Sequence, residues 1–314
     1  MSSFITGLEA RMILDSRGNP TVEVGCYVDV ALRGRAAVPS GASTGSHEAV
    51  ELRDGDMRLW IVKGVEGAVT NVVERIQDGL VGLPVDDQRV IDETMIEMDD
   101  TGNKANLGAN ATLGTSLACL HAASNVHQLP LWRYLGGLSG GSLPVPMMNI
   151  LNCGAHAASN VDVQEFMILP SGASSFTEAM RMGSEIYHHL KTVLSADSLT
   201  PAVGDEGGFA PNLETPESAL DLIMESIEKA GYKPGEEVNL WLDVAATEFC
   251  TDSLYTIKGK GELNSNEMID YLKTLKNSYP IYSIEDGLDE DDWQGWNILT
   301  EELGSQTQIV GEEL

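Results

Sequence analysis

Residues 238–244 read VNLWLDV, a mostly apolar run that contains a single acidic residue near its end. Two further runs of this kind follow in the chain, PIYSIE at 280–285 and TQIVGE at 307–312. The spacing of apolar residues between the runs predicts helices near 266–278 and 291–303. Strands that alternate with helices in this way predict a parallel α/β barrel, whose active site lies at the carboxyl ends of its strands.

Each of the three runs supplies one acidic residue at its end: Asp243, Glu285 and Glu312. A barrel would bring all three to the same mouth. Carboxylate oxygens suit a hard cation such as Mg²⁺, which prefers octahedral geometry and keeps water or substrate oxygens in its shell. Acidic residues after strands also begin ordinary loops, but three in succession favour a metal site. The spacing by itself names no reaction.

Two earlier apolar runs, VPMMNIL and VQEFMILP, precede a pair of predicted helices, the first over about 176–194 and the second over about 216–231. With them we count five barrel strands in residues 141–314. A complete eight-stranded barrel needs about 250 residues. The sequence therefore predicts an incomplete barrel, with about five of eight strands.

The first 140 residues follow a different pattern. Residues 21–39 contain TVEVGCYVDV and the returning run RGRAAVP, which predict antiparallel strands, whereas 64–126 has helical spacing. One face of the first strand is expected to hold Val22, Val24, Cys26, Val28 and Val30. The Gly-rich stretch at 135–147 is the best linker candidate. We therefore expect an N-terminal α+β domain over 1–140 and the partial barrel over 141–314.

The composition excludes several classes of protein. Asp and Glu outnumber Lys and Arg by 48 to 19, and the formal net charge of -29 argues against binding to nucleic acid or to anionic membranes. No apolar stretch is long enough to predict a membrane span or a signal peptide. The cysteines lack CxxC spacing and have apolar neighbours, which is typical of packed, reduced thiols: Cys26, Cys119, Cys153 and Cys250. A cytoplasmic location is the simplest expectation.

Residues 203–212 read VGDEGGFAPN and place Asp205 beside Glu206 among glycines. Repulsion between neighbouring carboxylates makes it harder to ionise both, so one of them tends to keep its proton near neutral pH, as suits a general acid. The glycines allow a ligand to approach the backbone closely. Taken alone, the decapeptide is more simply interpreted as a solvated turn.

Several long motifs occur in the order and spacing of enolase: DSRGNPTVEV (15–24), PSGASTG (39–45), ELRDGD (51–56), LGAN (107–110), VQEFMILP (163–170), VGDEGGFAPN (203–212) and SIEDGLDEDDW (283–293). The chain resembles enolase from end to end, most closely the bacterial form. The resemblance implies a hydro-lyase, phosphopyruvate hydratase, which in glycolysis and gluconeogenesis reversibly dehydrates 2-phosphoglycerate to phosphoenolpyruvate. It also implies two Mg²⁺ ions per active site and a cytoplasmic homo-oligomer, a dimer or larger.

The resemblance also assigns roles to individual residues. Glu206 matches the acid that assists departure of hydroxide, and Glu165 lies beside it. His156, in the loop LNCGAHAASN, and Gln164 match residues that line the substrate cavity together with Glu165. Without the family, His156 would be interpreted as an ordinary loop histidine. The metal ligands implied by the resemblance are Asp243, Glu285 and Glu312 for the first ion and Ser43, in PSGASTG, for the second.

The chain departs from the enolase pattern at several positions. The family has Asp where this chain has Glu312 and Glu313, and the extra methylene moves the carboxylate oxygens outward, which puts metal affinity in question. Cys153 and Val62 replace glycines that are usual in the family, and Trp241 adds a bulky ring beside Asp243.

The family's proton-abstracting lysine, a second lysine, and the His and Arg that help bind phosphate match no position of the sequence. We therefore expect a truncated enolase that carries the acid and metal half of the site without the lysine base. Two alternatives remain open: a non-catalytic binding or structural homologue, and a superfamily member that acts on another carboxylate substrate. The phosphoglycerate-type loops at 39–45 and 203–212 oppose the second.

Overall fold

The computed structural model describes residues 3–41, 45–154, 161–204 and 207–312. The chain divides into two compact units, Met1–Ser142 and Leu143–Leu314, each with its own apolar core. None of the helices in the described ranges combines the length and apolarity that crossing a bilayer requires.

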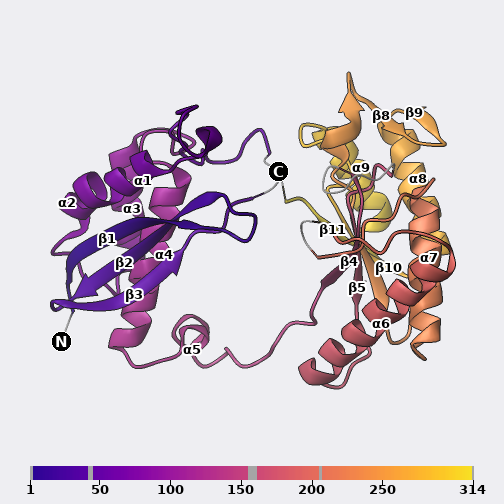
Figure 1. Cartoon of the computed structure of the whole chain (residues 1–314), viewed down its shortest axis with the longest axis horizontal. Helices are drawn as coiled ribbons and strands as arrows, with labels where there is room; N and C mark the ends of the chain where they lie inside the picture. The colour runs from indigo at the N-terminus through magenta and orange to yellow at the C-terminus, as the bar shows by residue number, and fades with distance from the viewer. Residues whose placement is uncertain (1–2, 42–44, 155–160, 205–206, 313–314) are drawn as a thin grey trace. The chain divides into compact units, whose positions relative to one another are not determined.

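The N-terminal unit is built on an antiparallel sheet of order β1-β2-β3 (Figure 1). Its strands are β1 (Ile5–Leu14), β2 (Pro20–Val28) and β3 (Ala31–Ala37). Its helical elements are η1 (Trp60–Val62), α1 (Glu66–Thr70), η2 (Asn71–Ile76), α2 (Gln77–Leu80), α3 (Gln88–Asp99), α4 (Ala109–Val126) and α5 (Leu131–Gly136). The antiparallel strands and the helical region that the sequence predicts are both present.

The central strand, β2, buries one face against α4. Val22, Val24, Cys26 and Val28 are all fully buried, as the alternation predicts. The expectation for Val30 is wrong, because this side chain is 90% exposed. The strand ends at Val28, and the turn to β3 holds Asp29 and Val30 at positive φ (50° and 64°), so the alternation no longer applies there.

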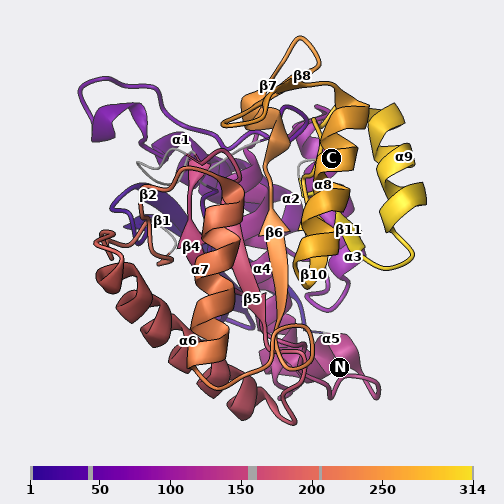
Figure 2. The same cartoon turned by 90° about the vertical axis from the view of Figure 1, so that its right-hand side faces the viewer.

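The C-terminal unit contains a sheet of order β11-β10-β6-β5-β4, formed by the described residues. Its strands are β4 (Met148–Asn152), β5 (Glu165–Leu169), β6 (Asn239–Asp243), β10 (Ile281–Glu285) and β11 (Gln308–Val310). The main helices are α6 (Phe176–Ala196), α7 (Pro216–Lys229), α8 (Ser265–Ser278) and α9 (Trp293–Leu303). A turn, η4 (Ala246–Phe249), and a small sheet of β7 (Cys250–Thr251), β8 (Leu254–Ile257) and β9 (Gly261–Leu263) follow β6. Figure 2 shows α7 and α8 across one face of the large sheet.

Side-chain caps explain where these helices begin. Asn264 accepts a hydrogen bond from the backbone N–H of Glu267, whose carboxylate accepts one from the N–H of Asn264, so α8 starts with a capping box. A single side-chain cap, without the reciprocal bond of a capping box, precedes each of α6, α7 and α9: Ser175, Thr215 and Asp292. The caps fix the helix starts, and therefore the lengths of the loops that lead back to the sheet.

The large sheet is open over the described residues, and it is mixed, so the unit has the form of an incomplete α/β barrel. The predicted five strands are confirmed, but the expectation that all are parallel is wrong: β5 runs antiparallel to both β4 and β6. Two antiparallel helices, α6 and α7, connect β5 to β6 and return the chain to the end of β5, where Asn239 pairs with Leu169. A single crossover helix would have given a parallel pair.

Candidate functional site

The reversed direction of β5 determines which residues share one edge of the large sheet. Because β5 is antiparallel to β6, its first residue, Glu165, pairs in register with the last residue of β6, Asp243. On the other side Asp243 pairs with Glu285, the last residue of β10. The strands β5, β6 and β10 lie side by side in Figure 2. The sheet therefore carries carboxylates at the matching ends of three adjacent strands.

Asp243 is buried at the centre of this edge, with 6% of its surface exposed. The side-chain amide of Gln164 donates to Asp243 Oδ2 over 3.3 Å, and the backbone N–H of Ala245 donates to Oδ1 over 3.1 Å. Neither donor is charged, so no described cation balances the carboxylate at these contacts. Gln164, which the resemblance assigns to the substrate cavity, thus contacts a carboxylate at this edge of the sheet.

Glu285 receives a hydrogen bond from a residue that the sequence identifies as unusual. The indole N–H of Trp241 donates to Glu285 Oε2 over 3.0 Å, since the two side chains project from neighbouring strands β6 and β10. The bulky ring therefore orients a carboxylate of the candidate site.

The clustering changes the acidity of both carboxylates. Burial raises the pKa of Asp243 to about 8, and the nearby charges of Glu285, Asp286 and Glu312 raise it as well. The hydrogen bond from the Ala245 N–H lowers this pKa and so opposes part of the rise. Burial also raises the pKa of Glu285, partly opposed by the Trp241 hydrogen bond. A bound cation or a proton would relieve this accumulation of negative charge.

Glu312 follows β11, and its residue is exposed. Its backbone N–H donates to Asp286 Oδ1 over 2.9 Å, and the Asp286 N–H donates to Val310 O over 3.0 Å. Asp286 was not singled out from the sequence, although the acidic pair at the end of PIYSIED was a usable signal. Asp286 connects the end of β10 to the segment that carries Glu312.

The donor set can be compared with what Mg²⁺ requires. Asp243, Glu285 and Glu312 offer only carboxylate oxygens, which is the ligand chemistry that Mg²⁺ prefers. Within the described ranges, however, no group of three or more His, Cys, Asp or Glu side chains is arranged to hold a metal ion. The residues fit the cation in chemistry, and the described conformation does not gather them into a closed coordination set.

The other predicted site residues, Ser43, His156 and Glu206, lie outside the described residues. The residues next to Glu206 are held firmly. The N–H of Gly204 donates to Gly208 O over 2.8 Å, and the hydroxyl of Tyr187 donates to Gly207 O over 2.9 Å. Among the described residues on either side of positions 205–206, Gly204 is therefore bonded to Gly208, and Gly207 is bonded to α6 through Tyr187.

Asn152 is a candidate site residue that the sequence reasoning missed. It is the last residue of β4, is fully buried and pairs in register with Glu165. Among the described residues, neither its Nδ2 nor its Oδ1 has a hydrogen-bond partner. A buried amide without a partner is costly, so its place beside Glu165 points to a role in the site. A polar residue at the end of the run VPMMNILN was the available signal.

Gly208 packs directly onto Asn152. A Cβ at position 208 would overlap the side-chain oxygen of Asn152 and would lie 3.0 Å from the carbonyl carbon of Ile150. The adjacent Phe209 accepts the N–H of Asn152 over 2.8 Å and donates its own N–H to Ile150 O over 2.9 Å. One glycine of VGDEGGFAPN is thus required for close contact with β4.

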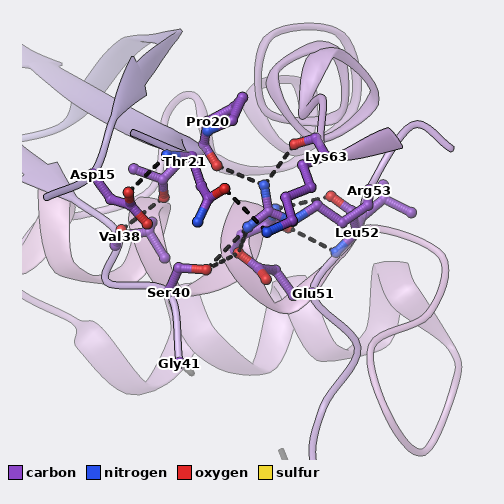
Figure 3. Close-up of polar contacts among 12 residues, drawn as sticks. Asp15, Pro20, Thr21, Val38, Ser40, Gly41, Glu51, Leu52, Arg53 and Lys63 are labelled. Carbon is purple, nitrogen blue, oxygen red and sulfur yellow. Dashed lines mark hydrogen bonds and ion pairs between the residues drawn. The ribbon is translucent and has the colours of Figure 1, made fainter. Parts of the chain in front are cut away.

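In the N-terminal unit, two arginines hold the residues that precede Ser43, and Figure 3 shows the contacts of one of them, Arg53. Arg53 donates to Ser40 Oγ over 3.0 Å and to Glu51 Oε1 over 2.7 Å. It also donates to the backbone oxygens of Pro20 and Lys63. Arg17 donates to the backbone oxygens of Ser40 and Gly41 over 2.8 and 3.1 Å. A cavity of about 740 Å³ lies next to Ser40 and Gly41 within this unit.

Comparison with known families matches both units. Residues 5–135 match the family model described as enolase, N-terminal domain. Residues 141–314 match the model described as enolase, C-terminal TIM barrel domain. The two matches follow one another along the chain in the order of its two compact units.

Proposed function

This chain belongs to the enolase family, and from that premise we propose that it acts as a lyase, phosphopyruvate hydratase, in the reversible dehydration of 2-phosphoglycerate to phosphoenolpyruvate. The observation that best supports the proposal is the alignment of Glu165, Asp243 and Glu285 on three adjacent strands. Carboxylates crowded in this way suit a metal-assisted reaction of an anionic substrate.

In this proposal Asp243, Glu285 and Glu312 hold one Mg²⁺ ion, and Ser43 contributes to a second. When bound, the ions supply positive charge that stabilises the negative charge developing on the substrate carboxylate. Gln164 and the Ala245 N–H fix the orientation of Asp243, and Trp241 fixes that of Glu285.

The acid part of the reaction falls to two glutamates. Glu206 donates the proton to the departing hydroxyl group. Glu165, which is buried and pairs in register with Asp243, assists it. His156 and Gln164 contact the substrate near the leaving group. We further propose that the protein, like other members of the family, is a cytoplasmic homo-oligomer that serves glycolysis and gluconeogenesis.

Metal binding provides the first test. Titration of the 314-residue chain with Mg²⁺ in a calorimeter should give saturable binding. The Asp243→Asn variant should bind Mg²⁺ with an affinity at least tenfold lower. Asp197→Asn, at an exposed position after α6, is the matched control and should bind Mg²⁺ as the unmodified chain does. Equal binding by all three proteins would contradict the assignment of Asp243.

The reaction itself is followed by the ultraviolet absorbance of phosphoenolpyruvate formed from 2-phosphoglycerate. The assay should be run on the 314-residue chain and on a version extended with a bacterial enolase C-terminal segment, which supplies the lysine base of the family. Activity that depends on Mg²⁺ and is lost in Glu165→Gln supports the proposal.

A non-catalytic homologue is the second candidate, favoured by Glu312, whose longer side chain replaces the family's Asp and is exposed. The same experiments separate the two functions. A chain that binds no Mg²⁺ at Asp243, and shows no activity when extended, would be a binding or structural homologue.

A further inference from the structure

Two cysteines far apart in the sequence meet inside the N-terminal unit. Cys26 lies on β2 and Cys119 on α4, and they are separated by 93 residues along the chain. Their sulfur atoms are 3.7 Å apart, and both residues are fully buried. A disulfide requires an S–S distance of about 2.05 Å, so the two sulfurs must come about 1.7 Å closer to form one.

The backbone around the two cysteines explains their closeness. Cys26 pairs in register with Gly34 of β3, and a Cβ at Gly34 would overlap the carbonyl oxygen of Ala118, the residue before Cys119. About one turn earlier in α4, a Cβ on Gly114 would lie 2.8 Å from the side chain of Val24. The helix therefore rests directly on the sheet, with glycines in place of side chains that would hold the two apart.

We propose that Cys26 and Cys119 form a redox modification site, in which an intramolecular disulfide links β2 to α4. The site lies in the N-terminal unit, and it is independent of the proposed enolase activity. The oxidant belongs to the class of low-molecular-weight disulfides, such as glutathione disulfide.

The reaction is a pair of thiol–disulfide exchanges. The thiolate of one cysteine attacks glutathione disulfide, which gives a mixed disulfide and releases one glutathione thiolate. The thiolate of the second cysteine then attacks the protein sulfur of that mixed disulfide and releases the second glutathione. Two cysteine thiols are oxidised, one glutathione disulfide is reduced to two thiols, and the two cysteine protons pass to the released thiolates.

The environment of the pair determines when this reaction can occur. Contact with Cys26, together with burial, raises the pKa of Cys119 well above its ordinary value, so the native protein holds very little thiolate at this position. A glutathionyl group also cannot enter a fully buried site. The disulfide therefore forms when the packing of α4 on the sheet opens, or while the chain folds, and not by rapid oxidation of the native state.

The test compares two ways of exposing the chain to glutathione disulfide. One sample is incubated in native buffer, and the other is unfolded in urea and refolded by dilution in the presence of the oxidant. Remaining thiols are alkylated, and the products are digested and analysed by mass spectrometry. In the refolded sample we expect one dominant linked pair of peptides, joined through Cys26 and Cys119 and about 2 Da lighter than the two reduced peptides together.

The matched control is the double variant Cys153→Ser and Cys250→Ser, which should form the same linkage, whereas Cys119→Ala should not. The oxidised chain should keep its far-ultraviolet circular dichroism, and its melting temperature should rise by about 5 °C or more. The proposal is overturned if refolding gives no link between Cys26 and Cys119, if links to Cys153 or Cys250 are as abundant, or if the linked protein melts at a lower temperature. The disulfide-linked peptides found in the unmodified chain test the proposal even if Cys119→Ala fails to fold.

Discussion

Glu165 and Asp243 are 78 positions apart in number yet face each other in register across the antiparallel pair of β5 and β6. Both residues are buried, with 9% and 6% of their surfaces exposed. A strand of the opposite direction would have placed Glu165 at the far end of the sheet. The candidate site therefore depends on the direction of one strand, and its charge crowding has measurable consequences.

Neutralising Asp243 should stabilise the metal-free protein. The pKa of Asp243 is about 8 in the folded chain, above the value of roughly 3.9 expected when it is unfolded. Between these values the folded state holds the proton that the unfolded state has released, so the stability falls as the pH rises from about 4 to about 8. With a chelator present at about pH 7.5, Asp243→Asn should unfold at a higher urea concentration than the unmodified chain. Its free energy of unfolding should be higher by about 1–3 kcal/mol. A less stable variant under these conditions would contradict the charge crowding.

Asp99 should behave in the opposite way. Burial raises its pKa, but hydrogen bonds from the Thr101 hydroxyl and from the N–H groups of Leu107, Thr101 and Asn106 outweigh this, so the pKa is lowered. Its contribution to stability is therefore complete above the unfolded pKa of about 3.9 and is lost as the pH falls through the lower folded value.

Replacing the Asp99 carboxylate should therefore cost about 1–3 kcal/mol at neutral pH, because Asp99→Asn leaves buried N–H donors unsatisfied. The difference in free energy of unfolding between this variant and the unmodified chain should become smaller at acid pH. Asp100→Asn is the control, since Asp100 is exposed and its positive φ of 54° suits asparagine. Stability is measured by urea unfolding at several pH values. Equal losses of stability in the Asp99 and Asp100 variants would refute the role of Asp99.

The contact between Gly208 and Asn152 can be tested by a double-mutant cycle. Gly208→Ala should destabilise the C-terminal unit by about 1–3 kcal/mol, because the added Cβ overlaps the Asn152 side chain and approaches Ile150. Truncating Asn152 to Ala in the same protein should recover part of the loss. Gly102→Ala, where a Cβ meets nothing within 4 Å, is the control and should be nearly neutral. Strict additivity of the two site variants would show that the contact does not carry the effect.

Arg53→Ala should loosen the segment that leads to Ser43. Its guanidinium donates to Ser40, Glu51 and two backbone oxygens, so its removal should cost about 2 kcal/mol and should speed hydrogen exchange at Gly41. Arg58→Ala is the control, because Arg58 is largely exposed and, among the residues that the structure describes, its guanidinium pairs with Asp56 alone. Unchanged exchange at Gly41 in the Arg53 variant would show that another contact holds this segment.

The sequence alone was sufficient for features that depend on neighbouring residues. The alternation of Val22, Val24 and Cys26 identified the buried face of β2, and Asp243 and Glu285 were recognised as the last residues of their strands. Periodicity reports these features because burial of one face and the end of an element are local properties of the chain. The motifs shared with enolase extended this reading to the family, which the comparison confirmed.

Only the tertiary structure decided which residues distant in the sequence contact one another. The direction of β5 put Glu165 beside Asp243, and the close packing of α4 brought Cys119 to Cys26. The backbone bonds of Phe209 to β4 brought Gly208 onto Asn152. Local periodicity is the same for a strand that runs in either direction, so it carries no information about register or partner. Those are fixed by the path of the connecting helices and by the packing of residues distant in sequence, which exist only once the chain has folded.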